Sequence, residues 1–401
     1  MSVRNGHGPR TVLHFIRTYL NKTETFIFSQ IQPTPRYRSW CMARDSKKGE
    51  TPLFPFPNLC IYSSWHPPSL SVRWAHVNYR AAKRMTGHEL RFYLSRIAAI
   101  RPDLVHLHYG PDAWYFLPVL QRLETPRLVS FYGYDASSFP RRYFGLGALF
   151  LRKVFRSVDR VLAMSEDMKS DLVRLGCPPE KIRIHYPNGV DMERFSRPEP
   201  HPRAREKVII LNVASMEGRK GQLDLVRAFS IVREKISGAE LRIAGEGPLR
   251  GDIEKAIRRL GLEGCVHLLG HVRYEDLPGL LSGADIFCHP SVTTARGDKE
   301  GIPTIILEAA ASCLPVVATV HAGIPEAVID GTSGFLVQEH DIPSLSQRLL
   351  ELCLDPGMRR AMGMAGRRHI EQRFDVRMLA EKREVLYDEL LSESSCRSGC
   401  R

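Results

Sequence analysis

The sequence contains no long apolar segment. No stretch of its 401 residues reaches the ~18 uninterrupted apolar residues that a membrane-spanning helix requires. Residues 1–11 carry Arg4, His7 and Arg10 but no apolar core of the kind that signal peptides have. We therefore expect a protein of the cytoplasm that has no membrane-spanning helix.

The sequence also lacks the cysteine patterns of a disulfide-bonded or zinc-binding domain. Its nine cysteines are an odd number and include no Cys-x-x-Cys pair, so neither a disulfide framework nor a zinc ribbon is predicted. Reduced thiols are the default for a protein of the cytoplasm. We expect no metal ion and no cofactor.

Acidic residues are scarce in the first half of the chain. Residues 1–200 hold 30 lysines and arginines against 16 aspartates and glutamates, a net charge of +14, whereas the remaining residues sum to −1. This imbalance favours contact with an anionic lipid surface, an anionic acceptor or nucleic acid, although a basic surface can also serve solubility alone. The aromatic residues are not interleaved with lysine and arginine as in known nucleic-acid modules, so we expect no nucleic-acid partner.

The stretch from Glu300 to Glu308 places two acids at a predicted loop-to-helix junction. Gly301 permits a tight turn and Pro303 suits the first helical position, so Glu300 should lie in the loop and Glu308 in the helix. A buried strand is predicted next, at residues 315–320. In a parallel sheet such a junction lies at the edge where ligands bind. Taken alone, however, two acids favour a capped surface helix with solvated side chains.

Several motifs surround this stretch in a fixed order. They are His289-Pro290-Ser291, Glu300-Gly301-Ile302-Pro303 through Glu308-Ala309, Pro315-Val316-Val317-Ala318-Thr319 and Gly323-Ile324-Pro325-Glu326. On these motifs the sequence resembles the retaining, nucleotide-sugar-dependent glycosyltransferases of family 4, and among them the branch that builds exopolysaccharide and capsule. The resemblance runs from about Thr11 to the last predicted helix, so it covers nearly the whole chain.

The resemblance implies an α/β fold of the GT-B type, in which two Rossmann-like domains face each other across a cleft. Residues 1–195 would form the acceptor-binding domain, residues 196–206 a proline-rich linker, and residues 207–375 the nucleotide-sugar donor-binding domain. The last segment, residues 376–401, would be a helix that crosses back to the first domain and ends in a frayed tail.

The resemblance also assigns residues to the donor. Lys220 corresponds to the family's diphosphate-binding lysine, and an ammonium on a loop before a helix is a sound anion site. Arg219 is expected to assist it, because Ser215 stands where the family usually has an arginine. Glu300 would hold the sugar hydroxyls and Glu308 the ribose hydroxyls. Glu300 and Lys220 are the predicted catalytic residues.

Backbone groups complete the predicted donor site. Pro325 suits an early helical position, so Gly323 and Ile324 are expected to present free N–H groups to an anion. Gly245, in a glycine turn after a predicted strand, and Val272, after the next strand, are expected to lie against the nucleotide. The chain has no Asp-x-Asp pair, so lysine and backbone dipoles should replace a metal ion on the diphosphate.

Three residues of the first half are assigned to the acceptor and sugar side. His108 ends a predicted buried strand, in a motif similar to His-x-His-Phe-Gly of the family. Tyr132 stands where the family commonly has a histidine facing the transferred sugar; its phenol can donate a hydrogen bond but cannot act as imidazole does near pH 7. An aromatic at the edge of the core is an equal alternative for Tyr132. Thr23 is expected to cap the first helix.

Residues 141–160 combine apolar side chains with six lysines and arginines. This composition is typical of a basic amphipathic helix that lies on an anionic membrane. A helix in the outer layer of the first domain, with its cations in water, accounts for it equally well.

The function predicted from these observations is retaining, metal-independent sugar transfer. The donor would be a nucleotide-sugar and the acceptor a lipid-linked saccharide or other glycan of cell-surface polysaccharide synthesis. The protein would work in the cytoplasm, attached peripherally to the inner face of the membrane. The alternatives are a sugar-nucleotide-binding protein without transfer activity, which Ser215 and Tyr132 favour, and a transferase that acts on a soluble small-molecule acceptor.

Overall fold

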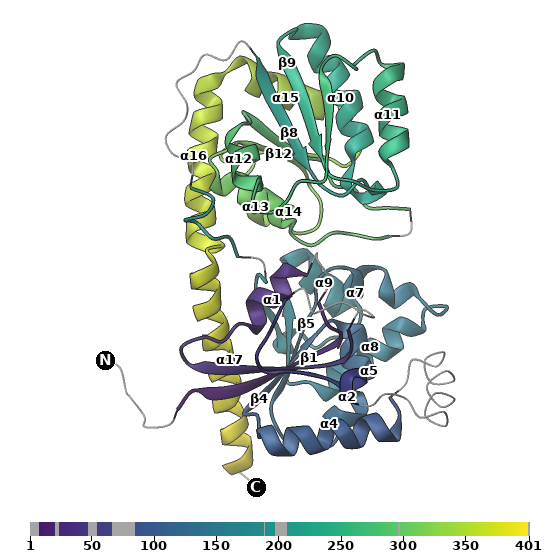
Figure 1. Ribbon diagram of the computed structural model, residues 1–401, viewed down its shortest axis with the longest axis vertical. Coiled ribbons are helices and arrows are strands. Elements are labelled where there is room, and N and C mark those ends of the chain that lie inside the picture. Colours follow the sequence, from purple (N-terminus) through teal and green to yellow (C-terminus); the bar gives the residue numbers. More distant parts are fainter. Residues whose placement is uncertain are drawn as a thin grey trace. The chain divides into compact units, whose positions relative to one another are not determined.

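The structure, a computed structural model, describes residues 8–20, 24–46, 54–65, 85–187, 189–196, 207–295 and 297–399 (Figure 1). Its contacts divide the chain into an N-terminal unit, residues 1–187 and 380–401, and a C-terminal unit, residues 188–379. The first division falls a few residues before the predicted boundary at residue 195. Of the predicted linker, residues 196–206, only Ser196 lies within the described residues.

The N-terminal unit is built on a parallel sheet of seven strands in the order β3-β2-β1-β4-β5-β6-β7. The strands are β1 (Arg10–Thr18), β2 (Tyr37–Asp45), β3 (Leu59–Ile61), β4 (Leu104–His108), β5 (Arg127–Ser130), β6 (Arg160–Ala163) and β7 (Ile182–Ile184). The apolar run at residues 11–16, which is typical of a buried strand, lies within β1. Strands β2 and β3 fall in the proline-rich stretch of residues 33–72, to which the sequence pattern assigns no element.

Short helices connect these strands, as the right-handed crossovers of a parallel sheet require. They are α1 (Thr25–Ile31), α2 (Tyr62–Trp65), α4 (Gly87–Ile100), α5 (Gly110–Tyr115), α6 (Leu117–Leu120), α7 (Tyr134–Ser137), α8 (Leu146–Ser157) and α9 (Glu166–Arg174), with single turns η1 (Phe139–Arg141) and η2 (Pro179–Lys181). Ser165, a residue type that favours the N-cap position, caps α9, because its hydroxyl accepts the N–H of Met168 at 3.1 Å. At α1 the N-cap position is Glu24, and Thr23 lies outside the described residues.

Helix α8 lies in the outer layer of the N-terminal unit. Its apolar side chains Leu151, Val154 and Phe155 are buried, and the Phe155 ring lies 5.9 Å from that of Phe131. Gly147 allows the close approach, since a Cβ there would lie 2.1 Å from the carbonyl oxygen of Phe139. The apolar stripe of residues 141–160 is therefore used mainly for packing within the unit.

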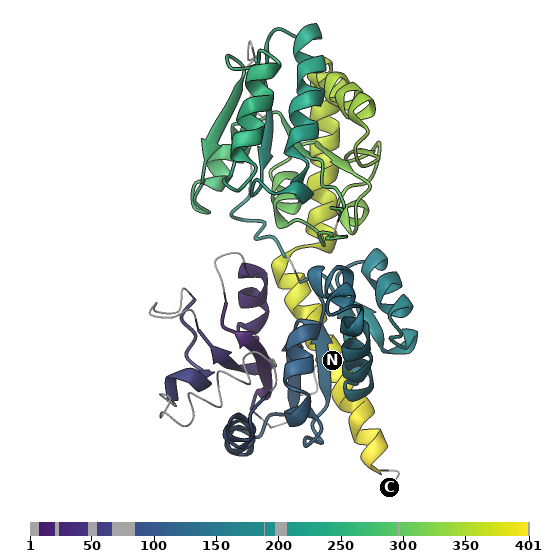
Figure 2. The ribbon, with the colours of Figure 1, turned by 90° about the vertical axis from the view of Figure 1, so that its right-hand side faces the viewer.

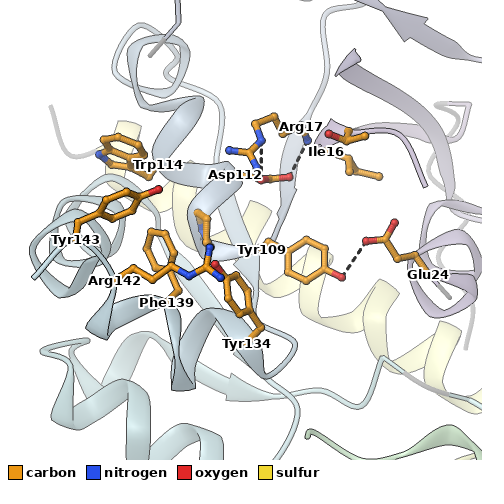
Figure 3. Close-up of a pocket in the computed structure, with 12 residues that line it drawn as sticks. Ile16, Arg17, Glu24, Tyr109, Asp112, Trp114, Tyr134, Phe139, Arg142 and Tyr143 are labelled. Atoms are coloured by element: carbon orange, nitrogen blue, oxygen red, sulfur yellow. Dashed lines mark hydrogen bonds and ion pairs between the residues drawn. The ribbon is translucent and has the colours of Figure 1, made fainter. Parts of the chain in front are cut away.

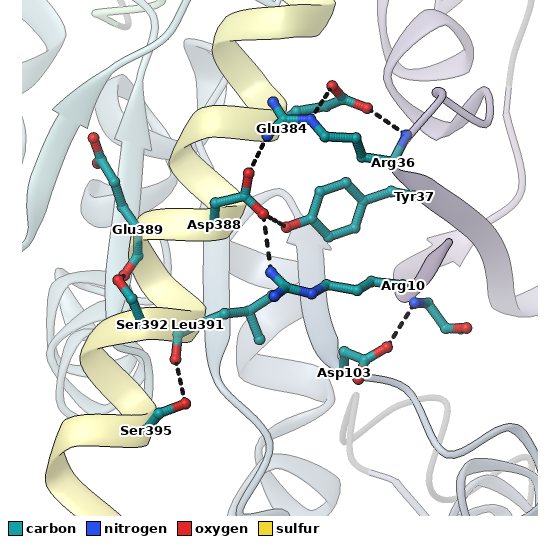
Figure 4. Close-up of polar contacts among 11 residues, drawn as sticks. Arg10, Arg36, Tyr37, Asp103, Glu384, Asp388, Glu389, Leu391, Ser392 and Ser395 are labelled. Atoms are coloured by element: carbon teal, nitrogen blue, oxygen red, sulfur yellow. Dashed lines mark hydrogen bonds and ion pairs between the residues drawn. The ribbon is translucent and has the colours of Figure 1, made fainter. Parts of the chain in front are cut away.

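The last helix, α17 (Val376–Gly399), begins in the C-terminal unit and packs on the N-terminal sheet from residue 380 onward (Figures 1 and 2). Tyr387 and Leu390 are buried against Val12, Tyr37 and Leu104. Around this core, carboxylates of the helix pair with arginines of the sheet: Arg36 Nε lies 2.7 Å from Glu384, and Arg10 Nη1 lies 3.0 Å from Asp388 (Figure 4). The predicted return of this helix to the first domain is confirmed.

The C-terminal unit holds a second parallel sheet, of six strands in the order β10-β9-β8-β11-β12-β13. The strands are β8 (Val208–Val213), β9 (Ala239–Ala244), β10 (Val266–Gly270), β11 (Ile286–His289), β12 (Val316–Thr319) and β13 (Gly334–Val337). In its core, the inner faces of the helices pack on strand residues such as Ile210, Leu241 and Val317, which are fully buried. The predicted strand at residues 315–320 corresponds to β12, and the apolar run at residues 208–214 is typical of a buried strand such as β8.

The helices of this unit are η3 (Gly218–Lys220), α10 (Gln222–Lys235), α11 (Arg250–Arg259), α12 (Leu277–Ser282), α13 (Thr304–Ala311), α14 (Ile324–Ala327), α15 (Ile342–Leu354) and α16 (Pro356–Arg373). Helix α13 begins one residue later than predicted, so Pro303 occupies the N-cap position. Among the described residues, no helix has the length and apolar character needed to cross a membrane.

Removal of the Tyr387 side chain should destabilise the N-terminal unit. The side chain is buried, its ring lies 5.1 Å from the Tyr37 ring, and its hydroxyl lies 2.7 Å from Nδ1 of His106. Tyr387→Ala should lower the free energy of unfolding by about 3–5 kcal/mol through the cavity it creates. Tyr387→Phe, which removes only the partner of His106, should cost about 1–3 kcal/mol. Urea unfolding measures both, and equal midpoints for the three proteins would contradict this packing.

Candidate active site

The predicted donor residues gather at one edge of the C-terminal sheet. The turn that carries Lys220 follows β8, Gly245 follows β9, Val272 follows β10 and Gly323 follows β12. All the strand pairs of this sheet are parallel, so their carboxyl ends meet at the same edge. This is the edge at which open parallel sheets bind ligands.

The turn Gly218–Lys220 is held against the segment that follows β11. Gly221, at the end of the turn, has a φ of +66°, and a Cβ there would lie 1.8 Å from the carbonyl oxygen of Pro290. The N–H of Val292 donates to the carbonyl oxygen of Arg219 at 2.9 Å. A glycine is therefore required at position 221 to bring the two cations Arg219 and Lys220 beside the loop that leads to Glu300.

Glu300 is the common partner of both predicted diphosphate-binding cations. Its Oε1 lies 2.5 Å from Nζ of Lys220 and 3.1 Å from Nε of Arg219. Its Oε2 accepts the hydroxyl of Ser291 at 3.4 Å and lies 3.7 Å from Nε2 of His289. The Glu300 side chain is only 7% exposed. Three residues that the sequence assigns to one site are thus brought into direct contact.

The charges in this cluster are fixed by their surroundings. Burial acts to raise the pKa of Glu300, but Lys220 and His289 together hold it well below its usual range, so the carboxylate stays ionised. Burial is also the main reason that the pKa of His289 is lowered. The cluster therefore carries an ionised glutamate between two cations, and a neutral imidazole beside them.

A second network, which the sequence analysis did not find, positions the backbone of Glu300. The N–H of Glu300 donates to Nε2 of His321 at 3.0 Å, so the proton of this imidazole is on Nδ1. Nδ1 lies 2.6 Å from Oε1 of Glu339, whose carboxylate also accepts the N–H and the hydroxyl of Thr293. His321 lies next to the predicted Gly323 motif, but Glu339 comes from beyond β13 and no local pattern connects it to the site.

Glu308 lies in a different environment from Glu300. It is buried in α13, and burial raises the pKa of its carboxyl to about 7, against the opposing effects of Tyr274 and Arg194. The Arg194 guanidinium lies 4.1 Å from the centre of the Tyr274 ring. Among the described residues, Glu308 forms no ion pair or hydrogen bond with Glu300 or Lys220, so its side chain makes a separate polar site.

The predicted pair of free amides at Gly323 and Ile324 is corrected by the structure. The N–H of Ile324 donates to the carbonyl oxygen of His321 at 3.0 Å, and the Ile324 side chain is fully buried. A tight turn after β12 uses this amide before the short helix α14 begins. Within the described part of the chain the N–H of Gly323 has no acceptor, although the residue is buried, so only one of the two predicted amides is left without a partner.

Gly245 and Val272 line a cavity of about 250 Å³ at the same sheet edge. Gly245 has a φ of +137°, and a Cβ there would lie 1.9 Å from the carbonyl oxygen of Ala214. Ser215, which replaces the expected arginine, and the side chains of Glu246 and His271 also line this cavity. Lys220 and Glu300 are not among its lining residues, so it is a neighbouring compartment of the edge.

The residues assigned to the acceptor side lie in the N-terminal unit. His108 is fully buried, with Nδ1 2.6 Å from the Tyr132 hydroxyl and Nε2 3.0 Å from Nδ1 of His14. Burial and the nearby Arg383 lower the pKa of His108 to about 3. Tyr132 packs in an apolar cluster with Phe26 and Tyr109, while Thr23 lies outside the described residues.

Three imidazoles in this region, His14, His106 and His108, bring one nitrogen each within 4.8 Å of the others. Their spacing is compatible with a metal ion, but hydrogen bonds occupy His106 on both sides, with the hydroxyls of Tyr387 and Ser130 at 2.7 Å. The positive charge of Arg383 contributes to the low pKa of His14 and His106 and would repel a cation in the same way. The geometry favours a network of neutral histidines.

Comparison with known proteins places both halves of the chain in one group. Residues 193–369 match the family model of glycosyl transferases group 1, and residues 60–194 match that of glycosyltransferase family 4. Proteins provisionally named as the colanic acid biosynthesis glycosyltransferase WcaL are similar to this chain. That of Escherichia coli is 36% identical over 252 residues, which are 62% of this chain and 61% of that protein. That of Salmonella typhimurium is 30% identical over 369 residues, which are 85% of this chain and 90% of that protein.

A solved structure shares the fold. Anabaena HepE, crystallised in complex with UDP, superposes with a TM-score of 0.75 over 95% of this chain and 100% of that protein, at 17% sequence identity. Two parallel-sheet α/β units and a returning C-terminal helix define a glycosyltransferase fold of the GT-B type. Within this class, the chain belongs to glycosyltransferase family 4.

Nucleotide binding should weaken as the pH falls through about 7, the pKa of Glu308 in the ligand-free protein. Ribose hydroxyls donate to an ionised carboxylate, and protonation removes acceptor capacity. If only the ionised form binds, the affinity for UDP or GDP should be about tenfold lower at pH 6 than at pH 8. Isothermal titration calorimetry at the two pH values measures this change.

Glu308→Gln provides the control for this pH effect. Its nucleotide affinity should be low and independent of pH between 6 and 8. Because the raised pKa means that the folded protein disfavours the ionised form, the variant should melt at a higher temperature than the parent at pH 8. The two melting temperatures should converge only below about pH 4.5, where the carboxyl is protonated in the unfolded parent as well as in the folded one. A parent affinity that does not change with pH would remove Glu308 from the ribose site.

Proposed function

We propose that this chain transfers a sugar, with retention of configuration and without a metal ion, from a nucleotide-sugar to a lipid-linked saccharide or another glycan. The observation that carries the proposal is the contact of Glu300 with Lys220 and Arg219 at the sheet edge. The relatives named for colanic acid biosynthesis support a role in the synthesis of a cell-surface polysaccharide. The UDP in the HepE complex supports a nucleoside diphosphate as part of the donor.

In this proposal, the donor diphosphate exchanges places with the Glu300 carboxylate. Lys220 and Arg219 hold an anion in the ligand-free protein, and the diphosphate takes over these cations when the donor binds. The displaced carboxylate then accepts the sugar hydroxyls. Negative charge on the diphosphate grows as the bond to the sugar breaks, so a cation fixed beside it stabilises the transition state more than the ground state.

Lys220→Ala should therefore lower turnover more than donor binding. The expected loss in kcat is about 10²–10³-fold, the usual effect of removing one electrostatic stabiliser. Steady-state kinetics and nucleotide titration measure the two effects, and Lys255→Ala, on the surface of α11, is the matched control. An equal loss in turnover and binding would limit Lys220 to ground-state binding.

Activity should also survive EDTA, because the proposed mechanism uses no metal ion. Rescue of an EDTA-treated enzyme by Mg²⁺ would contradict the metal-free mechanism.

The same assay separates transfer from binding alone. A protein that binds nucleotide-sugars tightly, yet shows neither transfer nor donor hydrolysis with any glycan, would instead be a sugar-nucleotide-binding protein. Ser215 in the neighbouring cavity and the partly buried Tyr132 are the two departures from the family pattern that favour this alternative.

We further propose that the N-terminal unit attaches to the inner face of the membrane. The segment before α8 ends in an exposed apolar tip: Phe144 is fully exposed, and Leu146 and Leu149 are nearly half exposed. Tyr143 and Phe144 have φ values of +56° and +57°, a conformation that side chains with a Cβ rarely adopt. Exposed cations lie close to the tip in sequence, at Arg141 and Arg142 before it and at Arg152, Lys153 and Arg156 after it, and apolar groups combined with cations are typical of segments that bind an anionic membrane.

Liposome co-sedimentation tests this attachment. Binding should increase with phosphatidylglycerol content and decrease in high salt, because each nearby cation contributes about 1 kcal/mol that salt screens. Phe144→Ser should weaken binding, and so should the joint change of Arg152, Lys153 and Arg156 to Gln. Leu354→Ser, at an exposed apolar position of the C-terminal unit, is the control. A protein that ignores anionic liposomes at low salt would favour a soluble acceptor.

A further inference from the structure

A second cavity, of about 390 Å³, lies in the N-terminal unit (Figure 3). It forms where β1 and β4 end and where α5 and α7 begin, at the carboxyl edge of the sheet. Five aromatic side chains and four charged ones line it: Tyr109, Trp114, Tyr134, Phe139 and Tyr143, with Arg17, Glu24, Asp112 and Arg142. This mixture of aromatic faces and charged groups differs from the aliphatic lining of a lipid cavity.

Contacts between aromatic rings fix the orientation of the aromatic side chains that line the cavity. Trp114 stacks on Phe150 with ring centres 4.4 Å apart and planes inclined by 19°. The Tyr143 ring lies 6.1 Å from Phe150 and 6.5 Å from Phe139. Fixed aromatic faces beside hydrogen-bonding groups match a pyranose ring, which has apolar C–H faces and a polar rim.

Two residues of the wall adopt strained backbone conformations. Tyr109 has a φ of +69° and Tyr143 a φ of +56°. Tyr109 is kept in place by its N–H, which donates to the carbonyl oxygen of Ser130, and by its hydroxyl, which donates to Glu24 at 3.2 Å. Such conformations are unfavourable for residues with a Cβ and are concentrated at functional sites. Both residues line the cavity and are drawn among its lining residues in Figure 3.

The charged groups of the cavity are unequally paired. Asp112 accepts the N–H of Arg17 at 2.7 Å and lies 3.6 Å from Nε of the same residue, while Glu24 accepts the Tyr109 hydroxyl. Arg142 differs, because its guanidinium lies 5.0 Å from the centre of the Tyr134 ring and no carboxylate of the described residues pairs with it. One exposed arginine at the cavity therefore has its hydrogen-bond donors open to an anion.

We infer that this cavity binds an acidic saccharide, with the sugar ring against Trp114 and Tyr143 and its carboxylate on Arg142. The inference rests on the proposed function only in naming this saccharide as part of the acceptor; the binding itself is independent of the donor. The fork of donors on a guanidinium matches a carboxylate in two parallel hydrogen bonds. The basic character of residues 1–200 favours the approach of such an anionic ligand.

The test compares cellobiouronate with cellobiose, two disaccharides that differ by one carboxylate. Binding to the full-length protein without nucleotide is measured by saturation-transfer NMR titration. Cellobiouronate should bind at least about tenfold more tightly than cellobiose, which corresponds to about 1.4 kcal/mol. Arg142→Gln should abolish this preference, whereas Arg141→Gln, at the exposed neighbour that does not line the cavity, should retain it. Trp114→Leu should weaken both disaccharides.

Glycerol 1-phosphate distinguishes a lipid phosphate from a sugar carboxylate. If it binds more tightly than cellobiouronate in a manner that depends on Arg142, the cavity holds a phosphate and the inference is wrong. Equal binding of the two disaccharides, no binding of either, or a preference that survives Arg142→Gln would also overturn it. Lys220→Ala should leave disaccharide binding unchanged. A failure of nucleotide binding in the same preparation would contradict the proposed function without affecting the saccharide result.

Discussion

The ionised carboxylate of Glu300 is the constraint on which the donor-side arrangement depends. A carboxylate that is only 7% exposed loses most of its hydration, at a cost of several kcal/mol, unless cations replace the lost water. Lys220 and Arg219 supply this compensation, so the turn that carries them must stay against the loop that carries Glu300. Gly221 makes that approach sterically possible. A change at any of these positions affects the whole cluster.

In the proposed mechanism, the same pairing offers the diphosphate two cations that are already in place. Two cations left alone in a partly buried site would repel each other, whereas here the Glu300 carboxylate compensates them in the ligand-free protein. The hydrogen bond from the Glu300 N–H to His321 fixes the backbone, whereas the proposed mechanism requires the Glu300 side chain to move. Glu339 and Thr293 hold that imidazole in turn. The site is thus preorganised through its backbone and adjustable through one side chain.

Local patterns were sufficient to predict much of the fold and part of the site. Apolar runs marked β1 and β12, and Ser165 marked the start of α9, because these signals act within a few residues. Contacts between distant segments left no such signal: Glu339 reaches the site only through the packing of β13 beside β12. The turn in which the Ile324 N–H donates to the His321 carbonyl oxygen was not predicted either. The sequence alone does not show which carbonyl oxygen accepts a given N–H.

The charge of the N-terminal unit was predictable in amount but not in position. Its central histidines are neutral, because burial lowers the pKa of His14, His106 and His108 well below physiological pH. The net charge of residues 1–200 is that of their arginines and lysines against their aspartates and glutamates. Anion recognition in this unit therefore depends on cations that line a cavity and are not paired with a carboxylate. Arg142 meets that condition, whereas an equally basic neighbour such as Arg141 lies outside the cavity.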